Sequence, residues 1–168
     1  MATIRAEHTR GRGTGINILP SALIALAVAA IAVLGGLATD TASTWYMELN
    51  KPEWQPPSWL FGPVWTTIYV LLAVSAIIAW HNSTGETRTR LMMLYGINGA
   101  LNLAWSFIFF QGHSPLWAGV DIIALWVTII MIMNQVRQVS TAASLLLLPY
   151  LLWVSFASVL NWTIVAIN

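Results

Sequence analysis

The chain has 168 residues, of which 58% are hydrophobic and only 8% are charged. A soluble domain typically carries about 25% charged residues, so this chain has too few charges to cover a water-facing surface, and lipid is its expected solvent. The net charge of +1 gives no electrostatic argument for a nucleic-acid partner, and the absence of cysteine excludes disulfides, thiolate catalysis and cysteine metal sites.

Apolar segments of spanning length follow one another along the chain. A transmembrane helix needs about 20 mostly apolar residues. Such segments cover residues 18–38, 60–80, 91–110, 116–134 and 142–165. The first is longer than the apolar core of a signal peptide, about 7–15 residues, and is read as a retained helix. The sequence predicts an all-α bundle of five transmembrane helices over residues 16–168, preceded by a disordered basic tail over residues 1–15.

The basic residues predict how the bundle lies in the membrane. With five spans, the N-terminal tail and the second and fourth loops share one side. Six of the seven basic residues lie on that side, and Lys51 is on the other; the six are Arg5, Arg10, Arg12, Arg88, Arg90 and Arg137. By the positive-inside rule, the N-terminus is cytoplasmic, and the first loop and C-terminus lie outside.

The loop between the first two spans is rich in tryptophan and proline. Pro52, Pro56 and Pro57 prevent a continuous helix there. Trp45 and Trp54 supply large, flat apolar faces with little rotamer entropy to lose. Two readings stay open from composition: a stiff lid over a cavity between helix ends, or an interfacial loop anchored by its tryptophans.

The residues from Trp45 to Trp65 also carry a specific motif, W-Y-x-x-L-x-K-P-x-W-x-P-P followed by G-P-x-W. This motif resembles the signature of the tryptophan-rich sensory protein family, also called the translocator protein or peripheral-type benzodiazepine receptor family. Further matches include Ala100-Leu101-Asn102, Pro149-Tyr150-Leu151 and Leu160-Asn161, so the resemblance covers residues 44–168.

The resemblance implies a five-helix bundle, usually dimeric, with a ligand cavity capped by the first loop. Family members bind porphyrins, and animal members also bind cholesterol and benzodiazepine-type drugs. Trp65 and Trp153 match tryptophans tied to porphyrin binding and breakdown, Asn98 matches a ligand-contacting amide, and Ala157 matches a position where substitution alters binding. The expected ligand-binding residues are Trp45, Trp54, Trp65, Tyr69, Asn98, Asn102, Trp105, Phe109, Asp121, Tyr150, Trp153 and Ala157.

Helical spacing supports part of this set independently. Asn98 and Asn102 share a face of the third span with Trp105 and Phe109. Amides inside an apolar span need partners, so they either bond between helices or contact a ligand. In the fifth span, Tyr150, Trp153, Ala157 and Asn161 share a face, where a small residue either leaves room for a ligand or permits close helix packing.

Two other features concern single positions in the spans. Asp121 is the only acidic residue inside a span. It has no titratable partner there for a proton relay, and the favoured reading is a structural bond to Trp or Asn donors. Gly96, Gly99 and Ala100 give the opposite side of the third span a small-residue surface, which predicts a homodimer through that face.

Three functions follow as hypotheses. The leading one is a membrane receptor or carrier for tetrapyrroles such as protoporphyrin IX, with no covalently bound cofactor and no metal site. The second is a light-dependent porphyrin-degrading enzyme using Trp65 and Trp153, although the sequence shows no nucleophile–base pair. The third is a sterol-binding translocator, but the tyrosine and basic residue of the animal C-terminal sterol pattern are absent from residues 161–168. This departure from the animal members indicates a bacterial member of the family, in a bacterial cell membrane.

Overall fold

The structure is a computed structural model that describes residues 18–168. The predicted tail, residues 1–15, lies outside the described residues. The elements in chain order are α1 (Ile18–Ala38), α2 (Thr44–Glu48), a 3₁₀ turn η1 (Ser58–Leu60), α3 (Phe61–His81), α4 (Gly85–Ser106), a π-helical turn η2 (Phe107–Gln111), α5 (Pro115–Val136), α6 (Thr141–Leu145) and α7 (Leu148–Ile167). Within these residues, five helical segments are long and apolar enough to cross a membrane, which confirms the predicted fold class.

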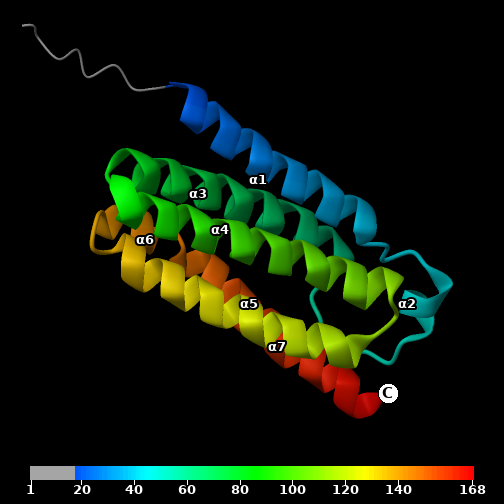
Figure 1. Ribbon diagram of the computed structural model, residues 1–168. Coiled ribbons are helices and arrows are strands. Elements are labelled where there is room, and N and C mark those ends of the chain that lie inside the picture. The colour runs from blue at the N-terminus through cyan, green and yellow to red at the C-terminus, as the bar shows by residue number, and fades with distance from the viewer. Residues whose placement is uncertain (1–17) are drawn as a thin grey trace, which may run out of the picture.

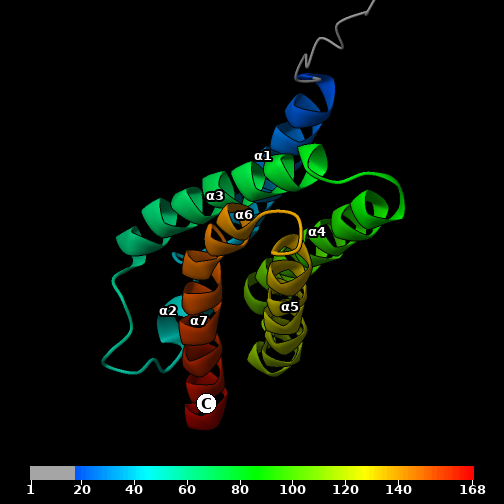
Figure 2. The ribbon, with the colours of Figure 1, turned by 90° about the vertical axis from the view of Figure 1, so that its left-hand side faces the viewer.

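The five long helices follow one another around the bundle in the order α3, α1, α4, α5 and α7 (Figure 1 and Figure 2). Each of these neighbours packs on the next, and α3 also contacts α4 directly. The ring closes between α3 and α7 mainly through the short helix α6, which packs against α3. The α3/α7 side of the bundle is therefore joined chiefly at one end.

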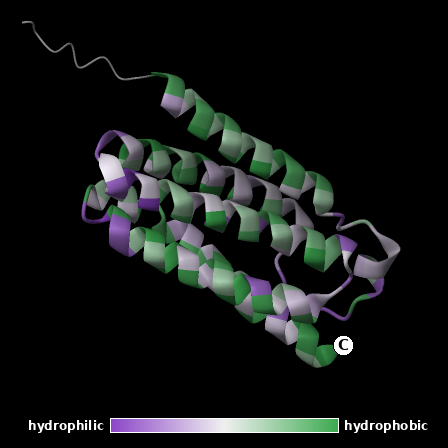
Figure 3. Ribbon diagram, in the orientation of Figure 1, coloured by the Kyte–Doolittle hydropathy of each residue, from purple (hydrophilic) through white to green (hydrophobic). Residues whose placement is uncertain are grey.

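Hydrophilic residues gather at the two ends of this bundle, and hydrophobic residues fill the helices between them (Figure 3). The turn between α3 and α4 lies at the same end as α6, whereas α2 and the C-terminus lie at the opposite end (Figure 1). Arg88, Arg90 and Arg137 are thus at one end and Lys51 is at the other. The predicted orientation depends on this separation of the arginines from Lys51.

The third span begins two turns earlier than its apolar run predicts, at Gly85 rather than at residue 91. Its first turns are polar and are held by local contacts: Arg90 bonds Glu86 one turn away (2.9 Å), and the Arg88 guanidinium bonds the Ser83 carbonyl and lies 4.6 Å from the Trp80 ring. Hydropathy marks only the part of a helix that lies in lipid, so it missed this extension.

The fifth span is also not the single helix predicted over residues 142–165. A short helix, α6, precedes α7, with Leu146 and Leu147 between them. Pro149 explains the break, because it has no backbone N–H to bond the carbonyl four residues earlier and fits best in the first turn of a new helix. Ser140 caps α6 by accepting a hydrogen bond from the Ala143 amide at 3.2 Å.

The buried core has two parts. One lies between α3, α4, α5 and α7 and includes Ile68, Ile129 and Val154. The other lies beneath the first loop and brings Tyr46 of α2 against Phe110 and Ile164. The first loop is therefore packed into the end of the bundle, and the candidate site lies where these two parts meet.

Candidate ligand-binding site

Amide and phenol side chains form one hydrogen-bonded network in the middle of the bundle. Tyr150 of α7 donates its hydroxyl hydrogen to Asn98 Oδ1 of α4 (3.1 Å) and accepts a hydrogen bond from Asn102 Nδ2 (3.3 Å). Tyr69 of α3 donates to Asn102 Oδ1 (2.6 Å), and Asn98 Nδ2 donates to Thr128 Oγ1 of α5 (2.9 Å). The two intramembrane amides thus have partners on other helices, as the apolar surroundings require.

A second polar contact point joins α4, α5 and α7 nearer the first loop. Asn161 Oδ1 accepts from the Trp105 indole N–H (3.2 Å), and Asn161 Nδ2 donates to the carbonyl of Pro115 (2.8 Å). Gly119 lies beside it: a Cβ added there would stand 3.1 Å from both Asn161 Nδ2 and the Trp162 ring. The missing side chain therefore lets α5 and α7 approach closely.

Aromatic rings continue from the network toward α3. The Trp65 ring stacks on that of Tyr69, with ring centroids 5.5 Å apart, and meets Tyr150 edge-on at 6.2 Å. Both Trp65 and Tyr69 are half-buried, while Tyr150 is buried. The Tyr69 and Tyr150 hydroxyls belong to the network, so one side of this group is polar and the other is a flat aromatic face.

A row of rings then leads out between α3 and α7 to the first loop. Phe61 at the start of α3 meets Trp153 edge-on at 5.7 Å, Trp153 lies 5.6 Å from Phe156, and Phe156 meets Trp54 of the loop at 5.8 Å. We call the rings of Phe61, Trp65, Trp153 and Phe156 the α3/α7 aromatic cluster. The predicted residues Trp65 and Trp153 both pack against the main core, Trp65 beside Tyr150 and Trp153 beside Phe61.

The remaining predicted aromatic residues form a separate group at the end of α4. Trp105 stacks on Phe109 at 5.2 Å, and Phe109 meets Trp45 of the loop at 5.7 Å. Trp45 also stacks on His113 at 4.5 Å. Trp45 thus attaches the loop to the α4–α5 connection, away from the α3/α7 aromatic cluster.

The first loop is fixed to the bundle by several polar contacts. Asn50 and Asn168 exchange two hydrogen bonds, at 2.9 and 3.0 Å, between the loop and the end of α7. Lys51 Nζ donates to the carbonyls of Tyr46 (2.5 Å) and Met47 (3.4 Å) and lies over the Tyr46 ring. Burial raises the pKa of the Tyr46 phenol, which Gln55 contacts at 3.2 Å with its amide nitrogen.

The other tryptophans of the loop differ in exposure. Trp59 is 72% exposed and Trp54 is 48% exposed, whereas Tyr46 is only 6% exposed. The loop therefore combines the two readings left open by its composition: it packs over the helix ends, and Trp59 extends outward as an interfacial anchor would.

Asp121 and Ala157 stand apart from these contacts. Asp121 of α5 is half-buried, and its buried Oδ2 has no hydrogen-bond partner among residues 18–168. The sequence predicts bonds from Trp or Asn donors on neighbouring helices to Asp121, and no such bond is present among these residues. Ala157 is half-buried beside the main core.

The small residues of α4 do not share one surface. Gly99 is buried, and a Cβ added there would stand only 2.6 Å from Ile31 Cδ1 of α1 in the same chain. Gly96 and Ala100 are exposed, and nothing among residues 18–168 lies within 4 Å of a Cβ added at Gly96. Gly99 therefore serves the contact between α4 and α1, and the predicted dimer face reduces to Gly96 and Ala100.

Two apolar grooves flank α7. The first, of about 420 Å³, lies between α3 and α7 and is lined by Pro63, Val64, Thr67, Ile68, Pro149, Leu152, Trp153 and Phe156. Because Trp153 and Phe156 also belong to the α3/α7 aromatic cluster, this groove opens beside the predicted site.

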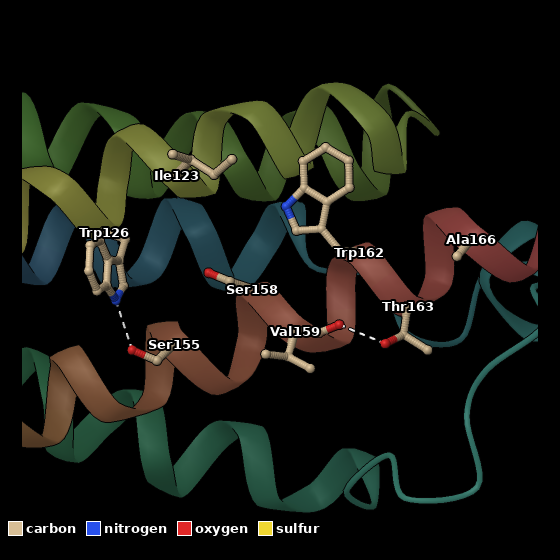
Figure 4. A pocket seen from close by; sticks show the side chains of 8 residues that line it. All are labelled: Ile123, Trp126, Ser155, Ser158, Val159, Trp162, Thr163 and Ala166. Atoms are coloured by element: carbon tan, nitrogen blue, oxygen red, sulfur yellow. Dashed lines mark hydrogen bonds between the residues drawn. The ribbon is translucent and has the colours of Figure 1, made fainter.

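The second groove, of about 710 Å³, lies between α5 and α7 and contains none of the predicted ligand residues (Figure 4). Trp126 Nε1 donates to Ser155 Oγ (2.8 Å) near one end of it, and Ala166 lies toward the other end. Ser155 and Thr163 donate their own hydroxyl hydrogens to carbonyls of α7, at 2.7 and 2.8 Å. Most polar groups that line this groove are therefore already hydrogen-bonded within or between α5 and α7.

Sequence reasoning missed several of these residues. Thr128 completes the polar network, and Trp126 and Ser155 join α5 to α7. Phe61 and Phe156 belong to the aromatic wall. The position of Phe156, three residues after Trp153 on the same helix, was the one signal that could have found it.

The fold and the site together define an integral membrane protein of five spanning helices, with an aromatic and amide-lined interior covered at one end by a Trp/Pro-rich loop. Residues 23–167 match the sequence profile of the TspO/MBR family. The chain belongs to this family.

Three relatives are similar in sequence to this chain over most of its length. It is 42% identical over 156 residues to Tryptophan-rich protein TspO of Chlorobaculum tepidum, which covers 90% of this chain and 98% of that protein. It is also 42% identical over 154 residues to Tryptophan-rich protein TspO of Archaeoglobus fulgidus, covering 91% and 99%. The Translocator protein of Homo sapiens is 37% identical over 122 residues, covering 71% of this chain and 72% of that protein.

Proposed function

We propose that this protein binds tetrapyrroles such as protoporphyrin IX inside the bundle, against the α3/α7 aromatic cluster, and serves as a membrane receptor or carrier for them. The observation that carries the proposal is the set of rings on α3 and α7: Trp65 packs on the tyrosines of the polar network, and Trp153 and Phe156 line a lipid-facing groove.

The chemistry of the wall suits a flat apolar ligand. Aromatic pairs in stacked or edge-to-face geometry contribute about 0.5–1.5 kcal/mol beyond the burial of their area. Ligand sites are mostly apolar, with volumes of about 300–1,000 Å³ and a few polar groups that fix orientation. The groove of about 420 Å³ beside Trp153 falls in this range. The Tyr69 and Asn102 side chains supply polar groups at the inner side.

A porphyrin also carries carboxylates at one edge, and the loop offers a base for them. Among residues 18–168, Lys51 is the only lysine or arginine at the end that carries α2 and the C-terminus. Its ammonium has three donors, and backbone carbonyls of Tyr46 and Met47 take two. The third has no acceptor among residues 18–168 and is available for a propionate at the rim.

The proposal is tested by titrating protoporphyrin IX into the protein in lipid nanodiscs and following the porphyrin's own fluorescence. We expect saturable binding that weakens about tenfold or more, equivalent to about 1.4 kcal/mol, in the double variant Trp65→Phe, Trp153→Phe. The matched control is Trp126→Phe with Trp162→Phe in the other groove. This variant also loses two indoles, and its affinity for protoporphyrin is expected to be unchanged. Non-saturable binding, or equal weakening by both variants, contradicts the proposal.

We propose further that the end bearing the first loop and the C-terminus faces outward, with the N-terminus in the cytoplasm. The arginines at the opposite end support this orientation. A reporter fused to the C-terminus is expected to be active only outside the cytoplasm. Activity restricted to the cytoplasm contradicts the orientation.

A homodimer through Gly96 and Ala100 is the third part of the proposal. Both positions are exposed on α4, and small residues let helix backbones approach closely in lipid. The double variant Gly96→Leu, Ala100→Leu is expected to be monomeric in detergent, as measured by light scattering. An unchanged dimer contradicts this interface.

A further inference from the structure

The two walls beside α7 are held in different ways. Side-chain hydrogen bonds join α7 to α4 through Tyr150 and to α5 through Ser155 and Asn161. Within residues 18–168, no side-chain hydrogen bond joins α7 directly to α3. Near the first loop, these two helices meet through the rings of Phe61 and Trp153. We call this line of contact the α3/α7 seam.

The groove on this seam reaches from the lipid-facing surface to the core. Leu152, on its outer edge, is 63% exposed. Ile68, which also lines the groove, is 2% exposed and belongs to the main core cluster. A molecule in this groove would therefore touch lipid on one side and the interior of the bundle on the other.

Two aromatic side chains line the groove and also pack against the core. Trp153 and Phe156 line the groove and are half-buried, and they contact Phe61 and Trp54 on their other sides. The indole N–H of Trp153 makes no hydrogen bond within the described residues. Because ring contacts are weakly directional, these side chains can change rotamer without breaking a hydrogen bond.

The loop, in contrast, is attached by directional bonds. Asn50 and Asn168 join it to the end of α7, and the Asn50 side chain also donates to the Ile167 carbonyl. Entry from water beneath the loop requires these bonds to break. Entry through the α3/α7 seam requires only that apolar rings move apart in a lipid environment.

We propose that the α3/α7 seam is the passage by which a flat apolar ligand moves between the bilayer and the interior, with Trp153 and Phe156 as its gate. This inference rests on the proposed tetrapyrrole binding and adds to it the source of the ligand. The ligand dissolves in the hydrocarbon, moves into the groove between Thr67 and Leu152, and passes inward beside Trp153. The first loop stays in place during entry.

The test uses cysteine pairs, for which the chain is well suited because it has no cysteine of its own. Thr67→Cys with Leu152→Cys places one thiol on each side of the seam, and a short bifunctional thiol reagent bridges them. Ile123→Cys with Val159→Cys bridges the other groove as the matched control. Asn50→Cys with Asn168→Cys fixes the loop to α7. Stopped-flow mixing with protoporphyrin-loaded vesicles gives the association and dissociation rates.

Bridging the seam is expected to slow association and dissociation together by about tenfold or more, with little change in affinity, because the bridge lies on the route. The control bridge and the loop bridge leave both rates unchanged. Unchanged rates in the bridged seam, or slowing by the loop bridge instead, overturn the seam as the passage while leaving tetrapyrrole binding intact. Absence of saturable binding before bridging overturns the proposed function and the passage with it.

A single substitution gives an independent check that needs no bridge. Leu152→Trp adds bulk at an exposed position on the groove's edge, where the fold has room for it. We expect slower association with unchanged affinity. Normal association in this variant, with the bridged seam also normal, overturns the passage.

Discussion

Helix α7 meets α4 and α5 through polar side chains, and it meets α3 through aromatic rings. On the first side, Tyr150, Asn161 and Ser155 each make a hydrogen bond to another helix. On the second, Trp153 makes ring contacts only, within the described residues. A buried hydrogen bond fixes distance and angle, whereas ring contacts tolerate sliding. The comparison indicates one fixed wall and one movable wall around the same interior.

The largest expected effect comes from breaking the fixed wall at Tyr150. Tyr150→Phe removes a hydroxyl that donates to Asn98 and accepts from Asn102, and it leaves polar atoms of both amides without that partner. We expect a loss of about 1–3 kcal/mol in the free energy of unfolding, measured by SDS titration in mixed micelles.

Tyr95→Phe is the matched control, because the Tyr95 hydroxyl bonds only Ser75 (2.7 Å) in the structure described. Its loss is expected to be smaller than that of Tyr150→Phe. Equal stability of the two variants would contradict the special weight given to the network.

The second effect concerns the close approach of α5 and α7 at Gly119. Gly119→Ala places a Cβ 3.1 Å from Asn161 Nδ2 and the Trp162 ring, so these side chains must give way by a few tenths of an ångström. Overpacking of this kind costs about 1–3 kcal/mol, and the low end is expected because the clash is small. Thermal unfolding measures it, with Gly36→Ala of α1 as the control, since nothing among residues 18–168 lies within 4 Å of a Cβ added at Gly36. A destabilised control with a stable Gly119→Ala protein would refute this account of the α5/α7 contact.

The third effect is the hydrogen bond across the outer groove. Trp126→Phe keeps an aromatic ring but removes the N–H that reaches Ser155. Hydrogen bonds between membrane helices average about 0.6 kcal/mol, and a loss of that order is expected in the same SDS titration. A gain in stability would show that this bond does not hold α5 to α7.

The smallest effect is on the loop and depends on pH. Burial raises the folded-state pKa of Tyr46 above its ordinary value of 10.0. The stabilising contribution is therefore fully present below about pH 10 and is lost as the pH rises through the raised folded-state pKa. Loop docking, followed by hydrogen exchange of residues 44–60, should weaken in that range. Tyr46→Phe should lack this pH-dependent step, and an identical step in the variant would assign it to another group.

Much of the fold follows from the sequence, because length and hydropathy decide which segments cross a bilayer. The limits arise where polar residues continue a helix, as at Gly85, or where Pro149 divides one. Helical spacing likewise placed Asn98 and Asn102 on one inward face, and the structure gives both amides partners there.

What spacing could not supply is the rotation of each helix against its neighbours. Spacing assigned Gly99 to a dimer face because it does not tell which helix covers that face. In the structure, Ile31 of α1 packs onto this glycine. It also could not pair Trp126 with Ser155, since this contact depends on how α5 and α7 are turned. Contacts between helices far apart in sequence therefore needed the structure.

The most direct test of the account is to map where a photoreactive protoporphyrin attaches in the protein in lipid nanodiscs. The two grooves on either side of α7 give distinct peptides. The account predicts labelling that protoporphyrin competes away and that falls on α3 and α7 around Trp65 and Trp153. Competed labelling confined to Trp126 and Trp162 in the α5/α7 groove would contradict it.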